Sequence, residues 1–422
     1  MTAWAVLLLA VGCAPAEAPA NAARYGFNVE DSTAALQAAI DSKAKTVVVP
    51  YMGEPWIIRP IKLRSDLELI FEPGVLVLAK KGEFQGGGDS LFTASGVENL
   101  VIRGYGATLH MRKRDYQNPP YKKAEWRMGI ALRNSRHVLV EGVRVESTGG
   151  DGFYVDGCED ITIRNAVAHD NHRQGISVIS VKNLLVENCV FSGTSGTPPE
   201  AGIDFEPDTA DQRLVNCVVR NCVFENNNGH AMLVYLKPLA RTSEPVSIRF
   251  ENCLARMGSA GMTVDDFKDM AQRGWSGMAV GAARDDGPQG LVEFVNCTAE
   301  NTGKEGVRLF DKSAAGVRVR FVNCSWRNPW LSAHRETSEP RVPILFQSRR
   351  SSVTSRPGGV DFVDCHVYDY TGRPALMLDE ESGSQGLYDV HGRITVRAPG
   401  GAHMRLGPKT EGVDLKVVEA AK

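Results

Sequence analysis

The sequence predicts an all-β protein, a parallel β-helix in which short strands stack into a solenoid, with a short capping helix at its N-terminal end. Three observations predict this fold. An Asn-Cys motif recurs along the chain, short alternations of apolar and polar residues lie between its copies, and few stretches after residue 60 have a helical period. Short strands at a loose repeat, without helices between them, are typical of solenoids.

The first 22 residues are predicted to be a leader and a tether. The apolar run in "MTAWAVLLLAVGC" is too short to span a bilayer, and it ends at Cys13 in a manner that resembles a bacterial lipoprotein signal. The following "APAEAPANAA" has the composition of a flexible linker. We therefore expect export to the periplasm or outer surface of a bacterium, with Cys13 as a lipid anchor.

Residues 23–60 are predicted to cap the solenoid. In "EDSTAALQAAID", Asp31 or Ser32 is placed to cap a helix near residues 32–42, and Leu36 and Ile40 share one of its faces. A helix here would cover apolar surface and a strand edge that the first coil would otherwise expose.

Residues 61–422 are predicted to form the β-helix itself. Asn suits the turn between strands because it tolerates the left-handed conformation and can bond to its neighbour on the next coil. The following Cys should point inward and stack. Parallel neighbours hold their Cβ atoms poorly for a disulfide, so these thiols are expected to be free core residues. The motif cysteines are Cys189, Cys222, Cys253, Cys297, Cys324 and Cys365.

The composition narrows the class of partner. The formal net charge of −2 gives no basic field for nucleic acid. We expect a monomer that acts on a polysaccharide.

Two stretches resemble a known superfamily. "DSTAALQAAIDS…TVVVPYMGEPWIIRPIKLRSDLELIFEPGVLVLA" resembles the opening segment of polygalacturonases and other pectin-lyase-like right-handed parallel β-helix proteins. "GDGFYVDGCEDITIRNAVAHDNHRQGISVIS" resembles two coils of mannuronan C5-epimerases. The resemblance implies a right-handed β-helix and a polysaccharide hydrolase, lyase, epimerase or adhesion protein.

The catalytic signatures of both enzyme families are incomplete. Asp156 and Arg173 match an Asp and an Arg of the epimerases. Their catalytic Tyr, Asp and His are replaced by residues that cannot serve as acid or base, namely Met128, Ala131 and Arg133. Asp151 falls on the Asp of the polygalacturonase "NTD" motif, but Arg173-Gln174 stands where its paired Asp residues belong. Neither activity is therefore expected.

Aligning the strand segments on their glycines predicts which side chains face outward. The anchors are Gly129, Gly152, Gly175, Gly202, then Ala231 and Gly261. Apolar residues one and three places later face inward, and the alternate positions form a polar outer wall. This wall comprises Asp151, Tyr154, Asp156, Gln174, Asp204, Glu206, His230 and Tyr235, with Asp208 beside Lys237 and with His172 and Arg173 at a feeding turn.

The stretch "EAGIDFEPD" places three carboxylates on this wall, where like charges repel. Pairing with Lys237 or Arg173, a bridging cation, or a retained proton would relieve the repulsion. A retained proton is what a general acid needs. The first prediction is therefore a glycoside hydrolase without a cofactor, with Glu206 as acid, Asp204 as base and Asp156 as substitute. The predicted substrate-binding residues are Asp151, Tyr154, His172, Arg173, Gln174, His230, Tyr235 and Lys237.

Two alternatives remain open. A polysaccharide lyase would use Lys237, Arg173 or His172 as base, with Ca²⁺ held by Asp204, Glu206 and Asp208. A surface protein that binds carbohydrate without cleaving it is the other. The charged, aromatic segment 111–127 interrupts the coils, and it is expected to be either a solvated insertion or a lip for an anionic sugar chain.

Overall fold

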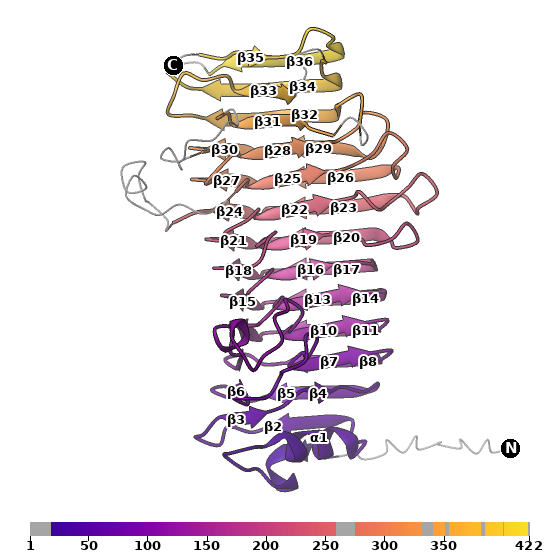
Figure 1. Cartoon of the computed structure of the whole chain (residues 1–422), viewed down its shortest axis with the longest axis vertical. Helices are drawn as coiled ribbons and strands as arrows, with labels where there is room; N and C mark the ends of the chain where they lie inside the picture. Colours follow the sequence, from indigo (N-terminus) through magenta and orange to yellow (C-terminus); the bar gives the residue numbers. More distant parts are fainter. Residues whose placement is uncertain are drawn as a thin grey trace, which may run out of the picture.

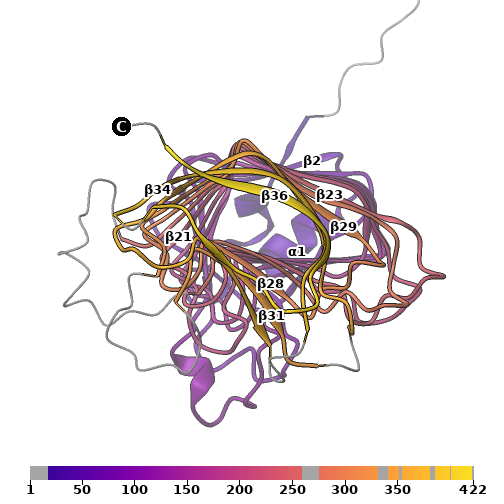
Figure 2. The ribbon, with the colours of Figure 1, turned by 90° about the horizontal axis from the view of Figure 1, so that it is seen from above.

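Parallel strands make up nearly all of the computed structural model, which describes residues 18–258, 275–330, 341–350, 354–380, 385–399 and 401–420. The strands stack coil upon coil along one axis (Figure 1), and the coils superpose when seen along it (Figure 2). Within the described ranges they form a 24-stranded sheet and a 12-stranded sheet, and every pair of named strands is parallel. The predicted all-β parallel β-helix is confirmed.

The 12-stranded sheet contributes one strand to each coil and carries the predicted wall. We call it sheet B. Its strands in stacking order are β4 (Ile61–Lys62), β7 (Phe92–Ser95), β10 (Ile130–Arg133), β13 (Phe153–Asp156), β16 (Ile176–Val178), β19 (Ile203–Phe205), β22 (Met232–Tyr235), β25 (Met278–Gly281), β28 (Val307–Phe310), β31 (Ile344–Ser348), β33 (Leu376–Glu380) and β35 (Met404–Arg405).

The 24-stranded sheet, sheet A, contributes two strands to most coils. The first set is β2 (Thr46–Val49), β5 (Leu67–Phe71), β8 (Glu98–Arg103), β11 (Arg136–Glu141), β14 (Cys158–Arg164), β17 (Val181–Glu187), β20 (Leu214–Arg220), β23 (Val246–Glu251), β26 (Gly290–Val295), β29 (Arg318–Val322), β32 (Gly358–Tyr368), β34 (Tyr388–Arg397) and β36 (Glu411–Glu419). The second set is β3 (Trp56–Ile58), β6 (Leu76–Ala79), β9 (Thr108–His110), β12 (Arg144–Glu146), β15 (Val167–His169), β18 (Val190–Ser192), β21 (Val223–Glu225), β24 (Leu254–Arg256), β27 (Thr298–Glu300) and β30 (Ser325–Arg327).

The N-terminal helix α1 (Thr33–Asp41) covers the first coil as predicted (Figure 1). Leu36 and Ile40 are fully buried. Of the two candidate caps, Asp31 acts, because its Oδ1 accepts a hydrogen bond from the Thr33 backbone amide at 3.0 Å. Ser32 makes no capping bond.

Two expectations for the chain's organisation need correction. Residues 20–22 were expected in a tether, but β1 (Ala20–Asn21) pairs with β2, and the short helix η1 (Ala22–Tyr25) follows directly. The coil expected at Gly261 lies outside the described residues, and the strand that pairs with β22 is β25. Among the described residues, no helix is long and apolar enough to cross a membrane. The leader and Cys13 lie outside the described residues.

The Asn-Cys motif behaves as predicted. Asn221 has φ 54°, in the left-handed region, and its amide donates to Asn188 Oδ1 at 3.3 Å on the preceding coil. The same bond links Asn252 to Asn221 at 3.2 Å. All six motif thiols are free and buried. Stacked phenyl rings extend the core beside them, with Phe250 and Phe294 centroids 4.8 Å apart or less, at 4.7 Å.

Candidate functional site

The register of sheet B matches the one predicted from the glycines. Tyr154 pairs with Ser177, and Ser177 pairs with Asp204. Asp204 pairs in turn with Leu233. The side chains of one outward column therefore belong to adjacent coils, with strands about 4.8 Å apart.

The wall is less exposed than predicted. Asp151, Gln174 and Ser177 are inaccessible to solvent, and Asp204 is 1% exposed. Part of the cover is the segment 111–127, whose Glu125 Oε1 lies 3.7 Å from Arg173 Nε. The alternation of residues reveals which way a side chain points, but not what a distant loop places over it.

An Arg-Glu ion pair is the centre of the site. Arg173 donates from Nη1 to Glu206 Oε1 at 2.6 Å and from Nη2 to Glu206 Oε2 at 2.9 Å. Gln174 Nε2 also donates to Glu206 Oε1, at 2.7 Å. Two-pronged contact of this kind fixes the orientation of a carboxylate. The Glu206 side chain is 18% exposed, so part of it faces solvent.

Asp151 lies behind this ion pair. Ser177 Oγ donates to Asp151 Oδ2 at 2.7 Å and lies 3.5 Å from Glu206 Oε1. Burial raises the pKa of Asp151 to about 7, although Arg173 and Ser177 act against the rise. Asp151 Oδ1 is buried without a hydrogen-bond partner. Near neutral pH this acid therefore retains its proton in part of the molecules.

Asp204 is the second buried acid. Burial, and after it the charge of Glu206, raise the pKa of Asp204 well above its ordinary value. Arg173 opposes this rise, but its guanidinium is held by Glu206. Burial alone would lower the pKa of Arg173, yet Asp151 and Glu206 raise it above its usual range, so the guanidinium remains charged. The site thus joins one ion pair to acids that hold protons.

A more accessible rim borders the buried group. Tyr154 is half-buried, with the Arg133 guanidinium 4.2 Å from its ring centroid. Arg133 Nη1 lies 3.7 Å from Asp156 Oδ2, and Gln212 Nε2 donates to Asp156 Oδ1 at 3.4 Å. The Asp156 side chain is 29% exposed. Burial raises its pKa, against the opposing charge of Arg133.

Other expected residues lie apart from the acids. His172 is buried among loops, where Nε2 meets Thr197 Oγ1 at 2.9 Å and Nδ1 meets Gln117 Nε2 at 3.3 Å. Burial, then the charge of Lys113, lower the pKa of His172. This histidine was expected to bind sugar, but its ring nitrogens are engaged in holding the loops together.

The remaining wall residues divide between an aromatic row and the solvent. His230 is buried against Trp275, with ring centroids 4.9 Å apart, and Tyr235 is half-buried beside Phe310 at 6.3 Å. Lys237 and Asp208 are both exposed. Among the ion pairs of the described residues, none joins them, contrary to the expected pairing.

The carboxylates do not converge as a calcium site would require. In the described part of the chain, no group of three His, Cys, Asp or Glu side chains is arranged to hold a metal ion. Asp204 is buried, whereas Asp208 is exposed beyond the end of β19. The trio expected for a calcium-dependent lyase therefore does not fit the metal.

The segment 111–127 is anchored by a residue that the sequence did not single out. Arg127 is fully buried and donates to the carbonyl oxygens of Phe84 at 2.7 Å and Lys122 at 2.7 Å. Its guanidinium also lies 5.1 Å from the Tyr116 ring centroid. Burial lowers the pKa of Arg127. A cation within an aromatic-rich segment was the available signal, but it predicted a lip on the surface rather than an internal anchor.

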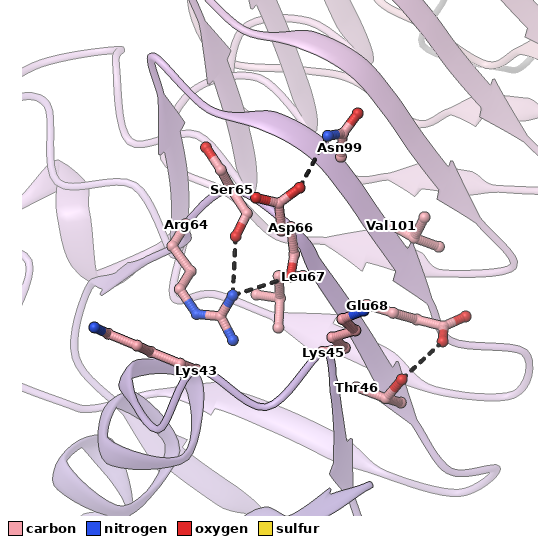
Figure 3. Close-up of a pocket in the computed structure, with 10 residues that line it drawn as sticks. All are labelled: Lys43, Lys45, Thr46, Arg64, Ser65, Asp66, Leu67, Glu68, Asn99 and Val101. Carbon is pink, nitrogen blue, oxygen red and sulfur yellow. Dashed lines mark hydrogen bonds between the residues drawn. The ribbon is translucent and has the colours of Figure 1, made fainter. Parts of the chain in front are cut away.

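A large open hollow lies far from these acids, near the capping helix. It has a volume of ≈ 980 Å³ and is lined by Lys43, Lys45 and Arg64, among others (Figure 3). Arg64 donates to the carbonyl oxygens of Ile40 at 2.7 Å and Ala44 at 2.6 Å, which ties α1 to the first coils. None of the predicted site residues lines this hollow.

Comparisons with known proteins agree with this fold. The family described as "Right handed beta helix region" matches residues 122–266. Two Bacillus subtilis proteins are similar in sequence, the SPbeta prophage-derived protein YorA at 23% identity and YclG at 26%. The matches cover 62% and 40% of this chain, but 45% and 33% of those proteins. The chain thus spans less than half the length of either relative.

Solved structures share the architecture at low identity. The mannuronan C-5 epimerase AlgE6 A-module of Azotobacter vinelandii has 15% identity and a TM-score of 0.66, over 96% of this chain and 100% of that one. The adhesin PfbA of Streptococcus pneumoniae has 12% identity and a TM-score of 0.62, over 95% and 93%. A family 28 exopolygalacturonase of Yersinia enterocolitica has 14% identity and a TM-score of 0.60, over 96% and 79%. The chain therefore has the right-handed parallel β-helix fold of pectin-lyase-like proteins.

Proposed function

We propose that this protein is a glycoside hydrolase that cleaves a polysaccharide on the outer face of sheet B. One observation supports this most strongly. Glu206 is a partly exposed carboxylate, fixed by Arg173 and Gln174, within a group of acids that retain protons. The resemblance of the fold to a polygalacturonase and an epimerase is consistent with a carbohydrate substrate.

The exposure of the acids changes the roles expected from sequence. Asp204 was expected to act as base, but it is buried, and its raised pKa favours the protonated form. Glu206 was expected to act as acid, but it is the one that Arg173 holds as a carboxylate. We assign Glu206 as the general base that activates water, with Asp204 as a supporting group behind it.

Asp156 is the proposed general acid. It is partly exposed, and burial raises its pKa, which keeps the proton available for a leaving group. It occupies the column of Glu206 two coils away, so their backbones are about 10 Å apart. Inverting glycosidases separate their carboxyl groups by about 6.5–9.5 Å to admit a water molecule. The proposed reaction is therefore an inverting hydrolysis.

The test is incubation with a panel of plant and algal polysaccharides. Reducing ends and the absorbance of unsaturated uronates are read in parallel, with and without chelator. We expect reducing ends without that absorbance, unaffected by chelator, and an inverted anomer in the first product seen by NMR. Glu206→Gln and Asp156→Asn should each lower turnover by about 10²-fold or more. Asp204→Asn should lower it by less than about 10-fold, because Asp204 does not meet the substrate.

The outcomes separate the alternatives. Products that absorb as unsaturated uronates would establish a lyase instead. Full turnover in Glu206→Gln and Asp156→Asn would place the reaction elsewhere. Binding without cleavage would support a surface protein that holds carbohydrate, an alternative favoured by the burial of Asp151 and Asp204 and by the resemblance to an adhesin fold. We further propose that the protein is exported and anchored through Cys13.

A further inference from the structure

An aromatic row continues the outer face of sheet B beyond Glu206. Tyr235 follows Glu206 in the same column, one coil further on, and Phe310 lies two coils beyond Tyr235. The Phe310 ring lies 6.3 Å from the Tyr235 ring, with 24° between their planes. It lies the same 6.3 Å from the His230 ring, at 5°. Phe310 therefore lies across the sheet, between the two ends of β22.

The position of Phe310 depends on a glycine. Gly281 pairs with Phe310 in the register of sheet B, and a Cβ on Gly281 would lie 2.3 Å from ring carbons of Phe310. The glycine thus allows the ring to lie down on the neighbouring strand. The ring packs against a small buried apolar cluster of Ala201, Leu233 and Ala279. Outward positions of a sheet are ordinarily polar, so three successive coils with an apolar outer face require a reason.

Cationic side chains border the far side of this row. Arg308 stands in the column of Asp204, three coils away, which is about 14 Å. Its Nη2 donates to Gln347 Oε1 at 2.5 Å, while Nη1 stays 3.8 Å from Glu305 Oε1, beyond hydrogen-bond distance. Lys304 Nζ lies 5.2 Å from the Trp275 ring centroid, and Trp275 is 38% exposed.

Arg308 differs from Arg173 in its partners. Arg173 is forked onto Glu206, so its charge is already matched within the protein. Arg308 bonds to a neutral amide, and the nearest carboxyl group is Glu305, which is fully buried with Oε1 lacking a hydrogen bond. Burial raises the pKa of Glu305, which weakens it as a counter-ion. Of the two arginines, Arg308 is the one suited to an anion from outside.

We propose that Tyr235 and Phe310, with Arg308 at their far end, form a subsite that binds the uronate units of an acidic polysaccharide. The aromatic faces contact the apolar face of the sugar rings, and Arg308 binds a carboxylate. The subsite extends from Glu206 toward β28 and β31, over a length of about three sugar units if each unit spans about one strand spacing. This proposal rests on the hydrolase function proposed for the same face and specifies its substrate class.

The test measures binding separately from turnover. The probes are polygalacturonate, alginate and neutral dextran, each cast into a native gel for affinity electrophoresis of the Glu206→Gln protein. Added to that background, Phe310→Ala should weaken binding to at least one acidic polymer about 10-fold. Arg308→Gln should weaken the same binding by a similar factor. Retardation by dextran should be weak throughout.

Control variants keep the result interpretable. Arg393→Gln removes an exposed cation from sheet A and should change nothing. Phe310→Leu keeps an apolar side chain without the flat face, so it should fold if Phe310→Ala does not, and it should also lose affinity. Unchanged binding in Phe310→Leu and Arg308→Gln would overturn the subsite, as would the absence of binding to both acidic polymers. Loss of binding in these variants, when the wild-type protein cleaves none of the polymers, would support the subsite and refute the hydrolase.

Discussion

Asp151→Asn should remove a large part of the pH dependence of folding stability. Asp151 is inaccessible to solvent, and burial raises its pKa to about 7 from a model value of 3.8. Between those two values the folded protein holds a proton that the unfolded chain has released. Stability contributed by that proton is complete below about pH 4 and is lost as the pH rises through about 7.

The size of the effect follows from the pKa values. Each pH unit in this window changes the free energy of unfolding by about 1.4 kcal/mol per proton. Because the curve flattens near the folded pKa, Asp151 should account for a loss of about 2.5 kcal/mol between pH 5 and pH 8. An asparagine has no proton to lose there, and its amide oxygen can still accept the hydrogen bond that Ser177 donates to Asp151.

The assay is urea unfolding of both proteins at half-unit steps from pH 5 to pH 8. The difference between them isolates Asp151 from histidines that titrate in the same range. The charged groups that act on it are Arg173, Glu206 and Glu125, and all three remain in the variant. The exposed Asp414→Asn serves as the control and should track the wild-type protein. Parallel pH curves for wild type and Asp151→Asn would show that Asp151 is ionised throughout and that the account of the buried acids is wrong.

Three further predictions concern other parts of the chain. Arg127→Met should lower the melting temperature by several degrees and speed protease cleavage within 111–127, because it leaves buried carbonyl oxygens unpaired at a cost of about 1–3 kcal/mol each; unchanged cleavage would mean that Arg127 is not the anchor. In denaturant without reductant, at least four of the six motif cysteines should react with a thiol reagent, and a block relieved only by reductant would contradict the free thiols. Cys13→Ser should move the protein from the membrane fraction to the soluble fraction, whereas an unchanged distribution would rule out the anchor.

Much of the fold could be predicted because it depends on repetition. The Asn-Cys motif requires a left-handed turn followed by an inward thiol on each coil, and the described coils satisfy both requirements. The glycine alignment of Gly152, Gly175 and Gly202 fixed the outward columns because side chains alternate along a strand. The alignment did not reach past Ala231, since the next strand of sheet B begins at Met278 after a long insertion.

Burial at the site could not be predicted in the same way. It depends on Arg127 and Glu125, which belong to an insertion without a repeat. No periodicity links Arg127 to the carbonyl of Phe84, 43 residues earlier. For the same reason His172 appeared to be a wall residue, although loop contacts with Thr197 and Gln117 decide its position.

The acids of "EAGIDFEPD" show how position can be predicted while chemistry cannot. Three routes could relieve their repulsion, and the structure uses a different one for each. Glu206 pairs with Arg173, Asp204 is buried where the protonated form is favoured, and Asp208 faces solvent beyond the strand. Identical spacing thus leads to three protonation environments, because each carboxylate meets a different neighbour on another coil. Only the partly exposed Glu206 combines contact with solvent and a fixed orientation, which is why the catalytic proposal centres on it rather than on the acidic triplet as a whole.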